Sequence, residues 1–151
     1  MGKLKICIVA SAGGHLTEIL QIKKAFENYE HFFVTFYRED IKDKLKGKKI
    51  YFICDPKRNP IKFFKNFVQS LKIFLKEKPN VVISTGAGMA LAMLFIAKIF
   101  RKKIIYIESM ASVFRPSFTG KIAYYIADLF IIQWKHLKKY YPRAIYCGAL
   151  I

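Results

Sequence analysis

The sequence predicts an α/β domain in which helices cover both faces of a Rossmann-like parallel sheet. Short apolar runs rich in β-branched residues alternate along the chain with longer segments of helical periodicity. Glycine or small polar residues follow several of the apolar runs, as in βα turns. The 151 residues contain no repeat and no linker, and they suffice for a real core, so we expect one domain over residues 1–151.

The first apolar run, 5–10, predicts a buried strand, and the turn Ser11-Ala-Gly-Gly-His15 follows it. Apolar spacing then predicts a helix over 15–26. Glycines let backbone approach a ligand, and the first N–H groups of a helix carry partial positive charge, so the turn is a candidate anion site. A tight turn without a ligand explains the spacing equally well. The pattern is neither G-x-G-x-x-G nor a Walker A loop, so neither a dinucleotide nor a P-loop nucleotide is indicated.

The other elements follow from the same two periodicities. Further strands are predicted at 31–36, 49–54, 79–84, 103–107, 128–133 and 144–147, and further helices at 41–45, 60–76, 89–100, 122–127 and 134–141. The helix over 89–100 is apolar almost all round, which is typical of a helix buried on both sides or pressed into lipid.

The helix predicted over 60–76 places an apolar stripe opposite a row of lysines. The stripe consists of Ile61, Phe64, Phe67, Val68, Leu71, Phe74 and Leu75. A basic helix this rich in phenylalanine fits the interface of a membrane, whereas a helix packed on a sheet with its lysines in solvent is the commoner case. Phe63 lies off the stripe, where it is free to face lipid under either interpretation.

Charge and hydropathy together narrow the class of partner. The formal net charge is +17, and 54% of the residues are hydrophobic. This combination argues against disorder and for a packed domain that meets an anionic phospholipid surface, a nucleic acid or phosphorylated substrates. No nucleic-acid-binding motif is present and the phenylalanines follow core spacing, so we expect no nucleic-acid partner.

Two further patterns bear on the compartment. We expect no signal peptide, because the first strand follows the N-terminus at once, and the longest apolar run, 87–97, is too short to span a bilayer. The protein should therefore lie on a membrane rather than cross it. Cys7, Cys54 and Cys147 fall in apolar runs and are predicted to be buried free thiols, with no metal-ligand spacing to the histidines.

Four polar or glycine-bearing turns follow predicted strands: 11–15, 85–88, 108–109 and 133–134. In doubly wound folds, ligands bind outside the carboxyl ends of the strands, close to the point where the strand order reverses. The four turns therefore predict one ligand-binding edge.

Several motifs, spread in order along the chain, carry a resemblance to a known family. They are Ser11-Ala-Gly-Gly-His-Leu-Thr-Glu18, Val81-Val-Ile-Ser-Thr-Gly-Ala87, Ile105-Tyr-Ile-Glu-Ser109, Thr119-Gly-Lys121, Ala127-Asp128, Gln133-Trp134 and Tyr141-Pro142. The chain resembles, over nearly its whole length, the acceptor-side subunit of the two-subunit glycosyltransferases that elongate lipid-linked sugars. The family includes the membrane-docking subunit of the eukaryotic UDP-N-acetylglucosamine transferase acting on dolichyl diphosphate N-acetylglucosamine, and bacterial relatives in capsule and exopolysaccharide assembly.

The resemblance implies the N-terminal half of a GT-B enzyme that binds a polyprenyl or dolichyl diphosphate-linked sugar and the membrane. A partner subunit would supply the C-terminal half and would bind most of the UDP-sugar, which is the co-substrate, so no cofactor or metal is expected. The eukaryotic subunit has an N-terminal membrane helix and this chain shows none, so docking on the cytoplasmic side of the cell or endoplasmic reticulum membrane would depend on basic and aromatic surface.

Under this resemblance, particular residues become candidates. The candidate bases are His15 and Glu108, although His15 can instead cap its own helix and Glu108 can instead bind the acceptor or position the base. The candidate acceptor- and phosphate-binding residues are Ser11, Gly13, Gly14, Thr85, Gly86, Gly88, Ser109, Thr119, Gly120, Lys121 and Gln133. The candidate membrane-docking residues are Lys57, Arg58, Lys62, Phe63, Phe64, Lys65, Phe67, Arg101 and Lys102.

Two other functions stay open from the sequence. A non-catalytic scaffold could bring a self-sufficient enzyme to the membrane, in which case replacing His15 or Glu108 would leave sugar transfer intact. A stand-alone transferase would instead have to bind the nucleotide-sugar by itself.

Overall fold

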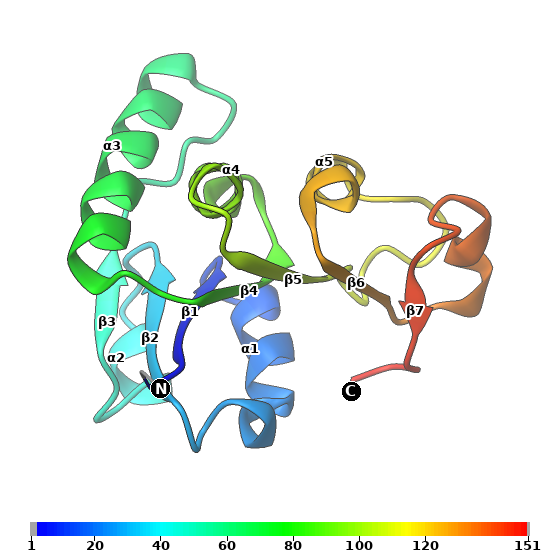
Figure 1. Ribbon diagram of the computed structural model, residues 1–151, viewed down its shortest axis with the longest axis horizontal. Coiled ribbons are helices and arrows are strands. Elements are labelled where there is room, and N and C mark those ends of the chain that lie inside the picture. Colours follow the sequence, from blue (N-terminus) through cyan, green and yellow to red (C-terminus); the bar gives the residue numbers. More distant parts are fainter. Residues whose placement is uncertain (1–2, 151) are drawn as a thin grey trace.

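A seven-stranded parallel sheet forms the centre of the computed structural model, which describes residues 3–150 (Figure 1). The strands are β1 (Lys5–Ala10), β2 (Glu30–Thr35), β3 (Ile50–Phe52), β4 (Val81–Gly86), β5 (Lys103–Ile107), β6 (Leu129–Ile132) and β7 (Ile145–Tyr146). The helices are α1 (Gly14–Gln21), α2 (Ile41–Lys44), α3 (Pro60–Glu77), α4 (Leu91–Ile99) and α5 (Phe118–Ile126), with 3₁₀ turns η1 (Lys23–Ala25), η2 (Gly88–Ala90) and η3 (Lys135–Lys139). The predicted fold class is confirmed.

The strand order is β3-β2-β1-β4-β5-β6-β7, and every adjacent pair is parallel. The chain therefore builds outward from β1 to β3, returns to the middle of the sheet and builds outward again from β4. In an open parallel sheet, such a reversal makes the region outside the carboxyl ends of β1 and β4 the ordinary place for a ligand.

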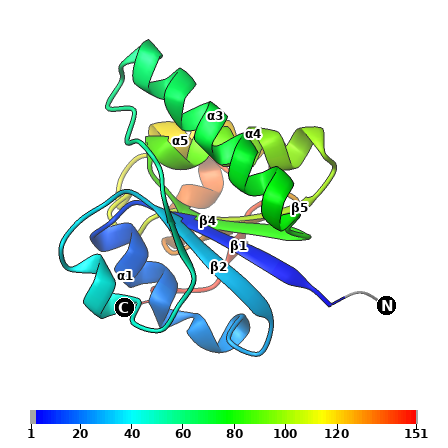
Figure 2. The same cartoon turned by 90° about the vertical axis from the view of Figure 1, so that its left-hand side faces the viewer.

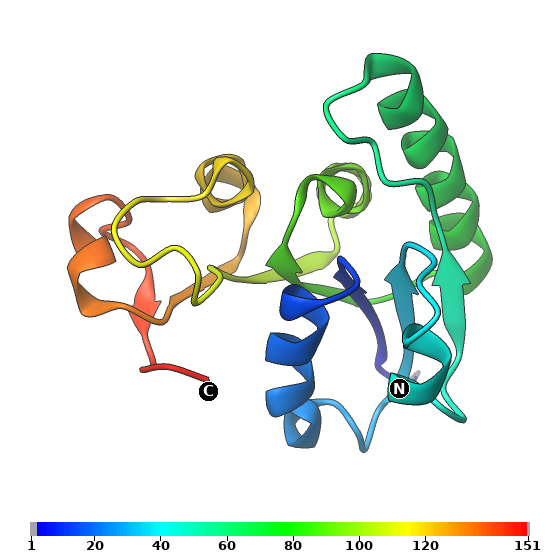
Figure 3. The same cartoon turned by 180° about the vertical axis from the view of Figure 1, so that it is seen from behind.

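Helices cover both faces of the sheet, as Figures 1 and 3 show from opposite sides. α3, α4 and α5 lie on one face, and α1 and α2 lie on the other. The alternation of β1 explains why both faces need cover: Cys7 and Val9 belong to the core beneath α3 to α5, and Ile6 and Ile8 belong to the core beneath α1.

Some element boundaries differ from the predicted ones. α5 begins at Phe118, four residues earlier than predicted, because the Ser117 hydroxyl caps it by accepting a hydrogen bond from the N–H of Gly120 (2.8 Å). The first helix ends at Gln21 and continues only as the 3₁₀ turn η1. The prediction of three buried thiols was wrong in part: Cys7 is buried, whereas Cys54 is half-buried and Cys147 is exposed on the edge of the sheet.

The helix α3 has a different inner face from the predicted one. Ile61 and Phe64 are 81% and 70% exposed, since the start of α3 reaches past α4 (Figure 2). Asn66 is buried instead, and its side-chain amide donates hydrogen bonds to the carbonyls of Cys54 (2.7 Å) and Met89 (3.1 Å). The amide thereby ties the loop after β3 to the turn before α4.

Glu77, the last residue of α3, connects α3 to the strands near their amino ends. Its buried carboxylate receives Lys5 (3.2 Å), Lys49 and the Tyr51 hydroxyl, so it joins α3 to β1 and β3. Burial raises the pKa of Glu77, but the hydrogen bonds from Lys49, Tyr51 and Lys5 outweigh burial and lower the pKa to about 2.

Replacing Glu77 by Gln should lower the free energy of unfolding by about 2 kcal/mol at pH 7, because charge-assisted hydrogen bonds are lost. A carboxyl whose pKa is depressed on folding stabilises the protein above its unfolded pKa, and this contribution disappears as pH falls toward the folded value. The difference between wild type and Glu77→Gln should therefore be greatest above about pH 5 and vanish near pH 2. Urea unfolding at several pH values measures it. Glu27→Gln, an exposed carboxylate, is the control, and equal stability of Glu77→Gln and wild type at pH 7 would contradict the assignment.

Candidate functional site at the carboxyl edge of the sheet

The four predicted turns do meet at one edge. They follow β1, β4, β5 and β6, which are neighbours in the sheet. The Thr85 hydroxyl donates to the carbonyl of His15 (2.8 Å), which joins the first turn to the second. The Gln133 side chain donates to the carbonyl of Glu108 (3.1 Å), which joins the third to the fourth. The predicted convergence is therefore confirmed.

The glycine turn after β1 presents free backbone donors. Gly13 has φ +109°, a conformation that an L-residue rarely adopts, and the N–H of Thr17 returns to its carbonyl (3.0 Å). No residue among 3–150 accepts a backbone hydrogen bond from the N–H of Gly14 or His15, and no side chain caps α1. These N–H groups and the helix dipole together favour an anion at this position.

Arg38 adds a cation to this turn. A Cβ on Gly13 would lie 2.9 Å from Nη1 of Arg38, so the guanidinium packs directly on the glycine. Asp40 orients the guanidinium by pairing with Nε (3.1 Å) and Nη2 (3.3 Å), which leaves Nη1 over the turn. Lys44 pairs with the same carboxylate and, with Arg38, lowers its pKa. The sequence indicated only a basic stretch here, because nothing local relates Arg38 to Gly13.

His15 is the second residue of α1, and its side chain is half-buried. Its Nδ1 atom is buried and has no hydrogen-bond partner within residues 3–150. Gly86, with φ +116°, lies against the imidazole, and a Cβ there would come within 3.4 Å of Cε1. The imidazole therefore stands between the first two turns, beside the free N–H groups of α1.

Glu108 is fully buried, contrary to what a base in contact with an acceptor requires. Its carboxylate accepts hydrogen bonds from the Ser117 hydroxyl (2.6 Å), the Ser117 N–H (3.1 Å) and the Tyr141 hydroxyl (2.7 Å). A Cβ on Gly120 would lie 2.0 Å from Oε2, so α5 packs on the carboxylate as well. Glu108 thus anchors the loop before α5.

Several predicted acceptor-binding residues are buried in the same way. They are Thr85, Gly86, Ser109, Thr119, Gly120 and Gln133. Their side chains or close packing hold the turns together, because the carboxyl edge is built from polar groups that satisfy one another. The predicted residues that remain accessible are Ser11, Gly13, Gly14, Gly88 and Lys121.

Glu18 is the residue that connects these buried groups, and the sequence pattern missed it. It accepts hydrogen bonds from the Ser109 hydroxyl (2.7 Å), the Met110 N–H (3.2 Å) and the Gln133 amide (3.0 Å). Helical spacing placed Glu18 between the apolar positions, among residues expected in solvent, yet it is only 5% exposed. Glu18 lies beside the two turns that follow β5 and β6, which come from distant parts of the chain, and this position explains the difference.

A cleft of about 800 Å³ opens next to the site. It lies between the loop 55–60, the first turn of α3 and the starts of α4 and α5, and Phe63, Gly88, Leu91, Phe118 and Thr119 contribute to its walls. Phe118 is 74% exposed, so the cleft has an apolar rim, to which Lys57 and Arg58 add positive charge.

The predicted membrane-docking residues fall in two places. Lys57, Arg58 and Phe63 line the cleft, and Lys62, Phe64 and Lys65 are exposed on the neighbouring turns of α3. Arg101 and Lys102 instead follow the far end of α4, at the opposite edge of the sheet, and Phe67 packs against the core. These last three residues do not share a surface with the cleft.

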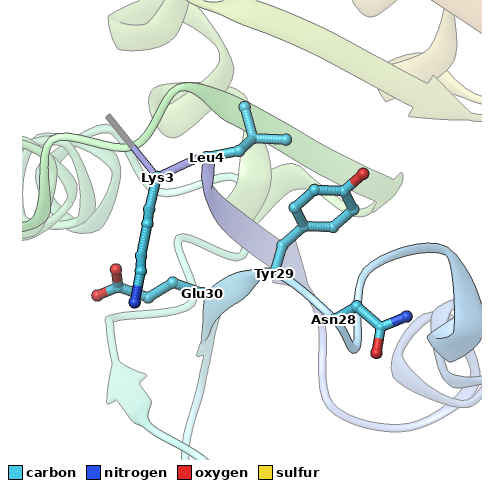
Figure 4. Close-up of a pocket in the computed structure, with 5 residues that line it drawn as sticks. All are labelled: Lys3, Leu4, Asn28, Tyr29 and Glu30. Carbon is cyan, nitrogen blue, oxygen red and sulfur yellow. The ribbon is translucent and has the colours of Figure 1, made fainter. Parts of the chain in front are cut away.

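Other hollows are less suited to a ligand. A cavity of about 440 Å³ lies between Lys3, Leu4, Asn28, Tyr29 and Glu30, at the amino ends of β1 and β2 (Figure 4). It is on the wrong edge of the sheet for the four turns. Within the described part of the chain, no three His, Cys, Asp or Glu side chains are grouped to hold a metal ion. No helix of residues 3–150 has both the length and the apolar character to cross a bilayer.

Solved structures share this fold at low sequence identity. UDP-N-acetylglucosamine 2-epimerase from Rickettsia bellii matches 99% of the chain with a TM-score of 0.79 and 15% identity. MurG from Acinetobacter baumannii matches 86% with a TM-score of 0.71 and 15% identity. The chain spans only 46% and 41% of the length of these two proteins. The match therefore shows that the chain shares the fold of one part of each of them.

Curated relatives match over a larger share of their length. UDP-N-acetylglucosamine transferase subunit ALG14 of Mus musculus is 26% identical over 98% of the chain and 83% of its own length, and that of Homo sapiens is 27% identical over the same shares. The family described as "Oligosaccharide biosynthesis protein Alg14 like" matches residues 54–150. The chain therefore belongs to the Alg14-like family of oligosaccharide biosynthesis proteins.

Proposed function

We propose that the chain is the acceptor-binding subunit of a transferase that moves N-acetylglucosamine from a UDP-sugar to a polyprenyl or dolichyl diphosphate-linked sugar. The names of the mouse and human relatives support a subunit of a UDP-N-acetylglucosamine transferase. A separate chain with the donor-binding half of a GT-B enzyme would complete the active site. This proposal needs no metal or cofactor from the present chain.

One observation carries the acceptor assignment: an anion-binding turn and an apolar cleft adjoin each other. Gly88 lines the cleft, and two residues earlier Gly86 lies against the His15 ring. A lipid-linked sugar has a diphosphate between an isoprenoid and a glycan. The N–H groups of Gly14 and His15, together with Arg38, suit the diphosphate, and the Phe63 and Phe118 walls suit the isoprenoid.

His15 is the base in this proposal. The acceptor hydroxyl oxygen would form a bond to C1 of the donor sugar while the bond from C1 to the UDP oxygen breaks. Nε2 of His15 would take the hydroxyl proton, and UDP would leave with the electron pair of the broken bond. The burial of Glu108 leaves His15 as the better placed of the two candidate bases, since a base must reach the proton that it removes.

The same cleft supports a proposal for how the chain is oriented on the membrane. Each lysine or arginine near an anionic leaflet contributes about 1 kcal/mol, so Lys57, Arg58, Lys62 and Lys65 suffice for peripheral binding. Ile61, Phe64 and Phe118 would enter the interface beside them. The chain would then lie on the cytoplasmic side with the open end of the cleft toward the lipid.

Replacing His15 by Ala should lower the rate of sugar transfer by about 100-fold or more in the reconstituted two-subunit enzyme, because general base catalysis is lost. Transfer of radiolabelled N-acetylglucosamine to a short-chain lipid acceptor measures this rate. His31→Ala, at the start of β2 on the other edge of the sheet, is the matched control and should retain activity. Full activity of His15→Ala, with partner and membrane binding intact, would favour the alternative of a non-catalytic scaffold.

Charge reversal at the two ends of the α3–α4 layer tests the membrane orientation. Lys62→Glu with Lys65→Glu should weaken binding to anionic vesicles by about tenfold or more, because two attractive contacts become repulsive. Arg101→Glu with Lys102→Glu makes the same change in net charge at the far end of α4 and should weaken binding much less. Vesicle sedimentation at two salt concentrations measures both pairs. Equal loss by the two pairs would show that net charge alone, rather than this surface, controls binding.

A further inference from the structure

Two buried polar groups without partners face the same glycine. The Tyr106 hydroxyl and Nδ1 of His15 have no hydrogen-bond partner among residues 3–150. A Cβ on Gly86 would lie 2.8 Å from the Tyr106 oxygen and 3.7 Å from Nδ1. The absence of a side chain at position 86 therefore lets the phenol and the imidazole approach each other. Buried polar groups are rarely left without partners, and these two lie near enough to each other for one water molecule or a small ring rotation to connect them.

Tyr106 is also near Glu108 and Ser117. Burial, followed by the nearby charge of Glu108, raises the pKa of Tyr106 well above its usual range, so the phenol keeps its proton and remains a donor. The neighbouring Ser117 hydroxyl donates to Glu108 (2.6 Å) and accepts from the N–H of Gly120 (2.8 Å). A hydroxyl oxygen has two acceptor positions, so the Ser117 oxygen can still accept one hydrogen bond from a neighbouring phenol.

The buried carboxylates at this edge lack a cation. No lysine, arginine or histidine in the described residues forms an ion pair with Glu108 or Glu18, although both are almost completely buried. Such charges are costly to bury unpaired. A positive charge that appears on His15 during proton transfer would be stabilised by them. Arg38, the nearest cation described at the glycine turn, is engaged by Asp40.

We propose that Tyr106 is a positioning residue for His15, connecting its imidazole to the carboxylate of Glu108 through the hydroxyl of Ser117. In this arrangement Nδ1–H donates to the Tyr106 oxygen across one water molecule, or directly after a small rotation of the two rings, and Tyr106 O–H turns to donate to Ser117. Nε2 is then the unprotonated nitrogen, which is the one that a base needs. The base role rests on the proposed function, whereas the connection between Tyr106 and His15 does not.

Nitrogen NMR of histidine-labelled full-length chain tests the connection without an activity assay. The wild type should show the Nδ1–H tautomer of His15. Tyr106→Phe should abolish this preference, because the phenol oxygen that accepts the Nδ1 proton is lost. Glu108→Gln should weaken the same tautomer preference while keeping the shape of the side chain. Thr35→Val is the matched control, since it removes another buried hydroxyl that has no partner in the described residues. Thr35 lies on β2, which β1 and β4 separate from Tyr106 on β5, so this change should leave His15 unchanged.

An unchanged tautomer of His15 in folded Tyr106→Phe would overturn the inference. If Tyr106→Phe does not fold, an unchanged tautomer preference in Glu108→Gln would overturn it equally. In the two-subunit enzyme, Tyr106→Phe should lower kcat about tenfold and leave the KM for the acceptor unchanged. If Tyr106→Phe leaves the NMR signals of His15 unchanged, only this inference is contradicted. If His15→Ala retains sugar transfer, the proposed base is contradicted, and the connection between Tyr106 and His15 is not affected.

Discussion

The carboxyl edge of this domain depends on buried carboxylates that are satisfied by uncharged donors. Glu18 on α1 accepts hydrogen bonds from residues at the ends of β5 and β6. Glu108 accepts hydrogen bonds from the loop before α5 and from Tyr141. Each carboxylate is bonded to segments that are far away in the sequence, so the hydrogen bonds fix the turns relative to one another as no local preference could. The glycine turn and the cleft can therefore stay open, because other residues hold the edge.

The sequence was sufficient for the architecture because each strand and helix carries its own periodicity. The four turns that follow predicted strands were expected to meet at one edge, and they do. Individual roles were harder to predict. Glu108 and Gln133 were predicted to belong to the site, but both are buried, because folding brings Ser117, Tyr141 and Glu18 to them. Arg38 was missed because its contact with Gly13 joins the end of β2 to the turn after β1.

The accessible groups and the buried groups at the carboxyl edge of the sheet have different roles. The backbone of Gly14 and His15, Arg38 and the cleft walls are open to a ligand, whereas Glu18, Glu108 and Gln133 form the frame behind them. Under the proposed function, the diphosphate, the isoprenoid and the attacking hydroxyl would meet the glycine turn, the cleft walls and His15, which lie along one edge of the sheet. The glycine turn has no dinucleotide motif, which fits the proposal that another chain holds the nucleotide-sugar.

The central claim is that this chain recognises the acceptor and leaves the nucleotide-sugar to its partner. Calorimetry of the isolated chain with a short-chain polyprenyl diphosphate N-acetylglucosamine, and separately with UDP-N-acetylglucosamine, tests it most directly. The account predicts saturable binding of the lipid-linked sugar, weakened at least about tenfold by Arg38→Ala through loss of a charge-assisted contact, and no saturable binding of the nucleotide-sugar. Binding of UDP-N-acetylglucosamine without binding of the lipid-linked sugar would contradict it.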